Sequence, residues 1–535
     1  MRKLLLALPL LAASPVAAQE LTPAEAALKA HVAFLASDAM RGRDTGSPEL
    51  AIAEQYVAAQ MLAAGLKPGG PNGGWLQPVP LVSFSPLDHG SLMLKRGATS
   101  VPLEWGVDYL TRANPREAEV ALGGQVVFAG YGVTDPSTGY DDYRGLDVRG
   151  KIVAILRDAP HTLQSEIRAH LSQVDIQAQN AAKHGAIGVI LLEGTSRHAS
   201  FPFERGVKRW DTSAMTWADA DGRAHADGGV PAFAYLGYVG AEKLFTGSKL
   251  KWADILAADQ AGKKLPKGEL GIGIEGVAHS RVAPSSGNNV IGLLEGSDPT
   301  LKAEYVVLSA HLDHVGVGKP DATGDTIYNG AMDNAVGTAS MLEVARRFQA
   351  TGTRPRRSIL FVAVTAEEQG LVGSEYYAAN PTVPASSIIA DVNLDMPIIT
   401  YKFEDLVVYG ADRTGIGPVV ARVAAAEGVT LTPDPTPEEA SFVRSDHYSF
   451  VRAGIPAVSL EPGPKGPGKA AIADFLEHHY HEPSDQVTLP IDWSQGVRFV
   501  SINFAIARAL ADGDQRPVWN KGDFFGTLYG GLGAK

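Results

Sequence analysis

From Asn288 onward, short apolar runs alternate with amphipathic segments, and this alternation restricts the fold more than any other feature. Strands buried on both faces of a parallel sheet typically read as continuous apolar runs, such as NNVIGLL, YVVLSA, SILFVAV, IIADVNL, LVVYG and IPAVSL. Helical spacing is found between or after them in NAVGTASMLEVARRFQA, GPVVARVAAAEG and WSQGVRFVSINFAIARALAD. The pattern predicts an α/β fold with a mixed, largely parallel sheet flanked by helices.

The segment from Ala118 to Ile274 has a different character. Short strand-like runs such as QVVFAG, KIVAIL and VPAFAYL alternate with stretches rich in Gly, Asp and Ser. We therefore expect a β-rich module, residues 118–274, inserted between the first part of the main domain, residues 19–117, and its larger part, residues 275–535. Two helices are expected in the first part, with Thr22 and Ser47 as their N-caps and a proline after each.

The first residues predict export. Arg2 and Lys3 precede a short apolar core, and Val16 and Ala18 are the small residues that a signal peptidase requires, so cleavage is expected after Ala18. The chain has 0 cysteines, which excludes disulfides and a cysteine-linked lipid anchor. We expect a bacterial periplasmic or secreted protein without a membrane span. The net charge of −12 argues against a nucleic-acid partner.

Ionisable side chains gather where the predicted strands end, or where the following helix begins. In an open α/β sheet, ligands bind at the carboxyl ends of the strands, so side chains at these positions are expected to share a partner. The candidates, in chain order, are His311, Asp313, Asp333, Glu367, Glu368, Asp395 and His481.

This residue inventory points to a pair of divalent cations. Zinc binds His nitrogen and carboxylate oxygen where no thiolate is present, and two cations can share a bridging carboxylate. Two imidazoles and three carboxylates would serve as ligands, and the remaining carboxylates could act as a general base or orient a ligand. We expect two Zn²⁺ ions, although cobalt or manganese would also fit.

Several motifs occur in the order and spacing of a known family. AHLDH, NGAMDNAVG, AEEQGLVGS, LDM, SDHYSF followed by GIPA, and YHEPSDQV resemble the M28 family of zinc aminopeptidases. The module, with AGYGV, YDDYRGLDVRGKIV and KHGAIGVILLE, is similar to the protease-associated (PA) domain that many members carry as an insertion. LASDAMRGRDTGSPE and WNKGDFFG also match, so the resemblance covers nearly all of the mature chain.

The resemblance implies a role for each candidate ligand. His311 and Asp395 would complete one metal position, and Glu368 and His481 the other. Asp333 would bridge both, and the peptide bond that follows it, to Asn334, would be cis.

The resemblance also implies the catalytic roles and the activity. Glu367 would be the general base, and Asp313 would hydrogen-bond His311 and fix its tautomer. The expected function is that of a dinuclear zinc aminopeptidase, which removes N-terminal amino acids from peptides with a free N-terminus through a metal-bridging hydroxide. The sequence does not indicate an oligomeric state or a preferred side chain.

Several positions leave alternatives open. His314 could be a further ligand, although capping or contact with a ligand is favoured. Asp391 has the same strand parity as Asp395, which is preferred because it ends the strand. In EHHYHEPSD the ligand could be His478, His479 or His481, and the spacing to Asp485 favours His481.

Other functions were weighed against the metallopeptidase. Ser445 and His447 could suggest a serine-type dyad, but no nucleophile-elbow glycine pattern surrounds Ser445. The same fold also hosts carboxypeptidases and glutaminyl cyclases, and metal-free relatives act as receptors. The complete set of ligand types in this chain argues against the receptor.

Overall fold

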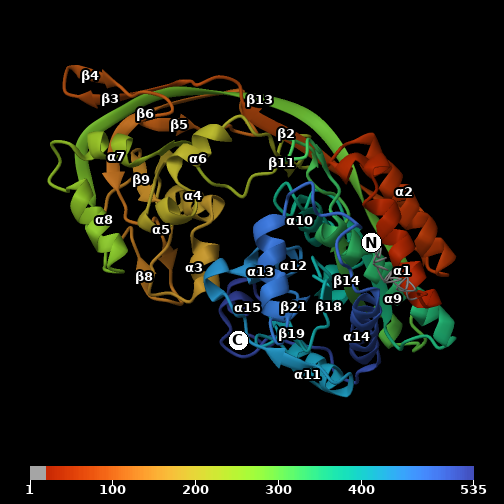
Figure 1. Cartoon of the computed structure of the whole chain (residues 1–535). Helices are drawn as coiled ribbons and strands as arrows, with labels where there is room; N and C mark the ends of the chain where they lie inside the picture. Colours follow the sequence, from red (N-terminus) through yellow and green to blue (C-terminus); the bar gives the residue numbers. More distant parts are fainter. Residues whose placement is uncertain (1–19) are drawn as a thin grey trace, which may run out of the picture.

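The computed structural model describes residues 20–535, so the expected signal peptide, residues 1–18, lies outside the described residues. Seventeen strands form one continuous sheet that has a part in the main domain and a part in the inserted module, here called the main sheet and the module sheet (Figure 1). Two small hairpins lie apart from it, one of them formed by β15 (Gly316–Val317) and β16 (Ile327–Tyr328). The main sheet and the module sheet share one long strand, β13, which crosses the top of the molecule as an arch.

The main sheet is mixed and largely parallel at its centre, as expected. β14 pairs in parallel with β17 on one side and with β18 on the other, and β18 pairs in parallel with β21. β13 and β19 join the edges of this core in the antiparallel direction. Across the sheet the strands are β1 (Lys67–Pro68), β13 (Gly268–Leu294), β17 (Ser358–Val364), β14 (Tyr305–His311), β18 (Ile388–Asn393), β21 (Ala457–Pro462), β19 (Asp405–Tyr409) and β20 (Thr430–Thr432).

Helices cover both faces of this sheet because its strands are apolar on both sides. One face packs against α1 (Pro23–Leu35), α2 (Pro48–Ala63), α9 (Val336–Thr351), α11 (Ile416–Ala426), α13 (Gly468–His478) and α14 (Trp493–Asp512). The other face packs against α10 (Val372–Ala379), α12 (His447–Arg452) and α15 (Phe524–Leu528). The expected N-caps are present, since Thr22 accepts from the backbone N–H of Glu25 and Ser47 from that of Leu50.

The inserted module is built on the module sheet, which has its own cores on both faces. Its strands are β3 (Ser91–Arg96), β4 (Thr99–Pro102), β5 (Tyr109–Thr111), β6 (Glu119–Phe128), β9 (Ile152–Leu156), β10 (Gly188–Leu192), β12 (Ala232–Leu236) and the first part of β13. Its helices are α3 (Ser165–Leu171), α4 (Val174–Lys183), α5 (Thr195–Ser200), α6 (Phe203–Lys208), α7 (Tyr238–Phe245) and α8 (Trp252–Gln260). A small hairpin of β7 (Thr134–Asp135) and β8 (Tyr140–Asp141) completes it.

The expected end of the module falls inside a strand, and its expected start lies just before one. β3 pairs with β13 and β5 pairs with β12, so residues 91–111 belong to the module sheet although 118 was the expected start. The expected end at residue 274 lies within β13, which continues into the main sheet. The middle of β13 pairs with β2 (Leu76–Pro86), which also pairs with β11 (Ala214–Trp217), and this ribbon connects the two domains.

The module also contacts the main domain through side chains. The Arg452 guanidinium of α12 pairs with Asp227 of the module at 2.9 Å and with Glu375 of α10 at 3.1 Å. The hydroxyl of Tyr448 lies 2.6 Å from Nδ1 of His170 on α3, so Tyr448 packs at this interface.

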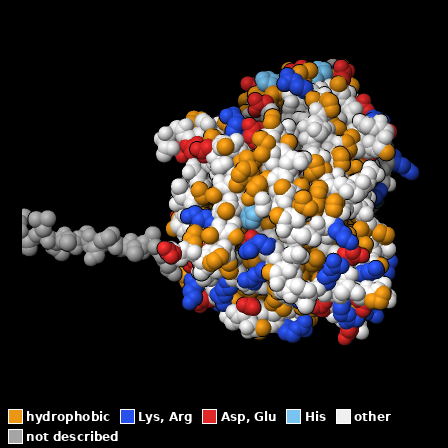
Figure 2. All heavy atoms as spheres, turned by 90° about the vertical axis from the view of Figure 1, so that its right-hand side faces the viewer, with side chains coloured by type: hydrophobic (Ala, Val, Ile, Leu, Met, Phe, Trp, Pro, Cys, Tyr) orange, Lys and Arg blue, Asp and Glu red, His pale blue; other side chains and the backbone are white. Residues whose placement is uncertain are grey.

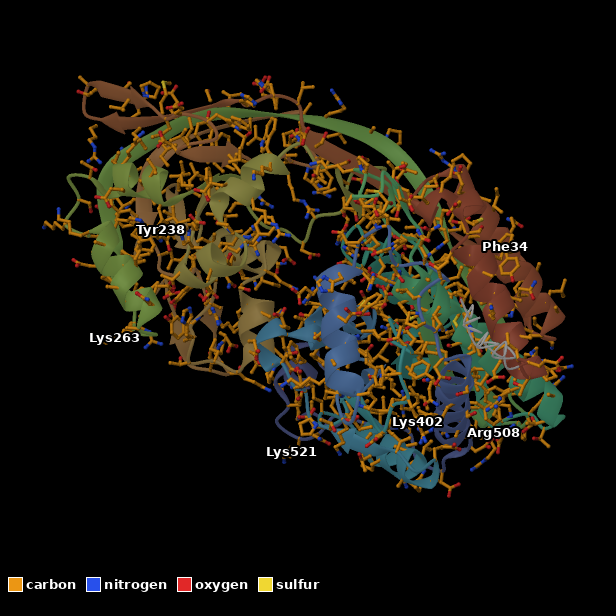
Figure 3. The ribbon with its side chains drawn as sticks, viewed as in Figure 1. Phe34, Tyr238, Lys263, Lys402, Arg508 and Lys521 are labelled. Atoms are coloured by element: carbon orange, nitrogen blue, oxygen red, sulfur yellow. The ribbon has the colours of Figure 1, made fainter. Side chains whose placement is uncertain are left out.

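The module and the pair α1–α2 lie at opposite ends of the molecule, marked by Tyr238 and Lys263 on one side and Phe34 on the other (Figure 3). The face over α1 and α2 mixes acidic and basic side chains with scattered apolar ones (Figure 2). Among residues 20–535, no helix combines the length and the apolar character needed to cross a lipid bilayer.

Candidate metal centre

The predicted site residues meet at one edge of the main sheet. His311 is the last residue of β14 and pairs with Val364 at the end of β17, after which the chain continues to Glu367 and Glu368. Ser309 of β14 pairs with Asn393 at the end of β18, and Asp395 follows. Because these strands are parallel, their carboxyl ends open at the same edge.

The first group consists of His311, Asp333 and Asp395, whose potential ligand atoms lie within 4.8 Å of one another. Nε2 of His311 lies 2.9 Å from Oδ1 of Asp395 and 3.2 Å from Oδ1 of Asp333. One imidazole therefore faces two carboxylates in a buried position, which suits a cation.

The second group consists of Asp333, Glu368, His481 and His314. Nε2 of His481 lies 3.2 Å from Oδ2 of Asp333 and 3.1 Å from Oε2 of Glu368. Asp333 thus faces the first group with one oxygen and the second group with the other, which is the arrangement of a bridging carboxylate. Neither His478 nor His479 belongs to either group.

The Asp485 carboxylate positions the loop that carries Asp333. The Asp485 carboxylate accepts hydrogen bonds from the backbone N–H groups of Met332, at 2.9 Å, and Asp333, at 3.1 Å. The peptide bond between Asp333 and Asn334 is cis, as predicted. The Asn334 side chain then donates to the carbonyl of Leu394 at 3.0 Å and ties this loop to the end of β18.

Asp313 acts on His311 through its backbone and not through its side chain. Nδ1 of His311 lies 3.1 Å from the backbone carbonyl oxygen of Asp313. The Asp313 carboxylate does not make the expected contact, and it accepts instead from the N–H groups of Glu367 and Glu368 and from the hydroxyl of Thr45. The tautomer of His311 is still fixed, with Nε2 facing Asp333 and Asp395, and the Asp313 carboxylate instead positions the two glutamates.

His314 differs from His311 in its second ring nitrogen. Nδ1 of His314 lies 2.7 Å from Oε1 of Glu368, but the buried Nε2 has no hydrogen-bond partner among the described residues. A ligating imidazole normally donates its other N–H to an acceptor. His314 is therefore better suited to donate from Nδ1 to Glu368 than to bind an ion, which agrees with the favoured sequence interpretation.

Asp395 is oriented by Ser445, and the serine-type dyad is not formed. The Ser445 hydroxyl donates to Oδ2 of Asp395 at 2.5 Å and accepts from the side chain of Asn393 at 2.6 Å. Both ring nitrogens of His447 are buried without a hydrogen-bond partner in the described part of the chain. The alternative ligand Asp391 accepts from the Ser309 hydroxyl at 2.9 Å and belongs to neither metal group.

Sequence reasoning missed Arg43, whose side chain is 1% exposed. Its guanidinium donates to the carbonyls of Leu312, at 2.9 Å, Asn329, at 2.7 Å, Gly330, at 3.0 Å, and Leu35. These bonds connect the segment between His311 and Asp313 to the loop that leads to Asp333. The motif LASDAMRGRDTGSPE contained Arg43, but a lone arginine in it gave no sign of this contact.

The surroundings of Glu367 and Glu368 shift the pKa values of these two carboxyl groups in opposite directions. Burial raises the pKa of Glu367 well above its usual range, and Asp395, Asp446 and Glu368 raise it further, against His311. Burial would also raise the pKa of Glu368, but contacts with His314 and His481 lower it to about 2. The two neighbouring glutamates therefore differ, with Glu368 held as an anion and Glu367 able to exchange a proton.

Two further histidine–carboxylate groups lie in or beside the module, and arginines already neutralise both. In the group Asp158, His161 and Asp259, Arg168 donates to Asp158 at 2.6 Å. In the group His225, Asp227 and Glu375, Arg452 pairs with both acids. Neither group resembles the sheet-edge site, where carboxylates face imidazoles alone.

Comparison with known proteins agrees with this geometry. Residues 289–507, which supply every ligand of the two groups, match peptidase family M28. The chain carries a peptidase family M28 domain. The chain is similar to leupeptin-inactivating enzyme 1 from Streptomyces exfoliatus, with 31% identity over 214 residues, covering 38% of this chain and 44% of the relative.

Another relative is the probable leucine aminopeptidase 2 of Aspergillus fumigatus, with 29% identity over 228 residues, covering 39% of this chain and 41% of the relative. The chain thus spans less than half the length of these curated relatives. Among solved structures, the aminopeptidase from Aneurinibacillus sp. strain AM-1 has 21% identity and a TM-score of 0.50, covering 91% of this chain and 93% of that chain. This likeness supports the fold.

Proposed function

We propose that the chain is a dinuclear metalloaminopeptidase, with zinc as the preferred ion, that releases N-terminal amino acids from peptides. The observation that carries this proposal is that two His–carboxylate groups share Asp333, while Glu367 lies beside both and belongs to neither. His311, Asp333 and Asp395 would hold one ion, and Asp333, Glu368 and His481 the other. Such ions, when bound, polarise a peptide carbonyl and make a water molecule more acidic.

The remaining steps are assigned to side chains of this protein. The Glu367 carboxylate would accept a proton from the attacking water and donate it to the leaving amine. A carboxyl group whose pKa is raised is better matched to both tasks near neutral pH than an ordinary glutamate. Asp313 supports this role because its carboxylate holds the backbone N–H of Glu367 at 3.1 Å.

The residues fit the proposed ions on chemical grounds. Burial lowers the pKa of His481, but Asp333 and Glu368 outweigh burial and raise it to about 10. In the metal-free protein, a protonated imidazole therefore stands between the carboxylates, where a divalent cation would supply the same kind of charge. The complete set of ligands favours an enzyme over a metal-free receptor.

The test compares peptides with a free and an acetylated N-terminus, with and without a chelator, and counts zinc ions per chain. We expect amino-acid release from the free peptide only, loss of release on chelation, and recovery with zinc. Release that survives complete removal of divalent ions would overturn the proposal.

Export and the module's identity are part of the same proposal. N-terminal sequencing of the protein recovered from the periplasm or the medium of a bacterial host should begin at Gln19, and an intact Met1 on that protein would contradict cleavage after Ala18. We assign the module as a protease-associated domain on the motifs that it carries, and its β-rich sheet between the two parts of the main domain supports this assignment.

A further inference from the structure

Three arginines from separate elements converge on one face of the module sheet. Arg112 follows β5, Arg157 follows β9, and Arg197 lies in α5 after β10. The backbone N–H of Arg112 binds the carbonyl of Phe233, two residues before Tyr235 in β12, and Cζ of Arg157 lies 5.9 Å from the Tyr235 ring. We call Arg112, Arg157 and Arg197 the arginine cluster.

The arginine cluster forms no ion pair in the described part of the chain. Within residues 20–535, no carboxylate pairs with any of the three guanidinium groups. Burial, together with the positive charges of Arg112 and Arg197, lowers the pKa of Arg157 to about 9, and Tyr235 acts against them. Burial also lowers the pKa of Arg112, and Arg197 adds to this effect. Cations held together in a partly buried place normally have anionic partners.

Two buried hydrogen-bond donors at the arginine cluster lack acceptors in the described part of the chain. In the described chain, the buried Nε of Arg197 has no hydrogen-bond partner, and neither does the hydroxyl of Tyr235, which is 7% exposed. A nearby acid, Glu193, is already engaged, because it accepts from the backbone N–H of Phe203 at 2.8 Å and contacts the ring of His198 at 3.1 Å. Buried donors without partners require an explanation, and a missing acceptor supplies one.

We propose that Arg112, Arg157 and Arg197 form a binding site for an oxyanion, either a carboxylate or a phosphate group, on the inserted module. Guanidinium groups bind both anions through paired N–H donors in a planar fork. All three arginines are half-buried, so their side chains can be reached from solvent. The Tyr235 hydroxyl would supply a further donor.

The site lies on the side of the module sheet that faces the main domain. α4 and α6 cover this side, whereas α7 and α8 lie on the far side (Figure 1). Asp175 of α4 lies 3.8 Å from Arg452 of the main domain, which confirms that α4 faces it. The anion could therefore be free phosphate or a carboxylate on a peptide held between the domains, and the second source rests on the proposed function.

The first experiment measures the binding of inorganic phosphate and of succinate to the full-length protein by calorimetry and by the shift of Tm. We expect both anions to bind and raise Tm, and Arg157→Gln to abolish the rise. Phosphate bound at the metal centre would survive this substitution, so the variant separates the two sites. Arg149→Gln is the matched control, because its side chain is 82% exposed in the same module.

The variant's own stability distinguishes a binding site from a structural role. Without anion, Arg157→Gln relieves repulsion, so its Tm should equal or exceed that of the parent protein. Absence of anion binding to the parent protein at millimolar concentration would overturn the proposal. So would an equal loss of binding in Arg149→Gln, or a lower Tm of Arg157→Gln with anion binding intact.

The second experiment identifies the source of the anion by comparing kcat/KM for peptides with a free and an amidated C-terminus. A preference for the free carboxylate that falls to parity in Arg157→Gln, with the amidated peptide unaffected, assigns the site to the substrate. Parity in the parent protein, with phosphate still bound, assigns it to a free anion. If no peptide is cleaved but phosphate binding depends on Arg157, the proposed function fails and the anion site stands.

Discussion

The candidate metal centre of the main domain and the arginine cluster of the module both gather several ionisable side chains, but they balance charge in different ways. At the metal centre, imidazoles lie between the carboxylates at 2.9–3.2 Å, and Asp485, Ser445 and Asp313 hold the loops around them. The arginine cluster has no such interleaved partner among the described residues. The first site is therefore organised before its ligand arrives, whereas the second depends on its ligand for charge balance.

The largest effect is expected from Asp333→Asn, because Asp333 belongs to both metal groups. Both ions should be lost on dialysis, and peptide hydrolysis should fall to background. Metal analysis per chain and amino-acid release measure the two results. Asp514→Asn, whose side chain is 89% exposed, should retain both ions. An unchanged metal content in Asp333→Asn would show that Asp333 does not bridge the two groups.

Glu367→Gln should separate the base from the ligands. We expect kcat to fall on the order of 10²–10⁴-fold with the metal content unchanged, because Glu367 moves a proton and holds no ion. Glu368→Gln is the control at the neighbouring position and should lose metal instead. Equal metal loss in both variants would contradict the division of roles between the two glutamates.

Arg43→Lys tests whether a buried arginine that donates to four carbonyls contributes more to stability than the arginines of the cluster, which have no carboxylate partner in the described chain. Lysine keeps the charge but cannot reach carbonyls on three segments at once, so stability should fall by about 2–4 kcal/mol. Metal affinity should also fall, since Arg43 connects the segments that carry His311 and Asp333. Denaturant unfolding and chelator competition measure the two effects. Unchanged stability and unchanged metal affinity in Arg43→Lys would show that Arg43 does not position the site.

Removal of metal should make stability depend on pH through His481. Its pKa is raised from 6.5 to about 10 in the metal-free protein, so its contribution is fully present below pH 6.5 and is lost as pH rises through 10. The Tm of the metal-free protein should therefore fall over this interval, and His481→Gln should reduce the fall. A fall of the same size in the variant would assign the pH dependence to other groups.

The smallest effect is expected from Arg197→Gln in anion-free buffer. Because the Nε of this guanidinium has no hydrogen-bond partner in the described chain and its Cζ lies 4.6 Å from the Phe201 ring, its removal should change the unfolding free energy by no more than about 1 kcal/mol. The contrast with Arg43→Lys would sharpen the comparison between a bonded and an unbonded arginine. A large loss of stability would mean that Arg197 has a structural role that its contacts do not reveal.

Much of the main domain could be predicted because its strands are continuous apolar runs and its ligands follow them. His311, Glu368 and Asp395 were placed together from their positions at strand ends, and parallel pairing brings such ends to one edge. The arrangement around them was harder to predict. The choice between the side chain and the carbonyl of Asp313 depends on what the carboxylate binds elsewhere, and that partner, Thr45, lies far away in the sequence.

The limits of the module and its arginine cluster were not predictable for a related reason. The expected end of the module falls within β13, which stays extended through Pro284, Ser285, Ser286 and Gly287, residue types that are typical of turns. Arg112, Arg157 and Arg197 are separated by long stretches of sequence, and nothing about each one alone distinguishes it from a surface arginine. Their backbones lie at different ends of β12 and in α5, and only their side chains extend toward one another.

Strand β13 also sets how the module could have been acquired. Pro86 of β2 and Ser280 of β13 are antiparallel partners, so the chain leaves the main domain and returns to it at neighbouring points. An ancestral hairpin at this pair could be opened to accept a new domain without moving any strand that carries a metal ligand. Because β13 is continuous, a displacement of the module would be transmitted along its backbone to the part of β13 that pairs with β17.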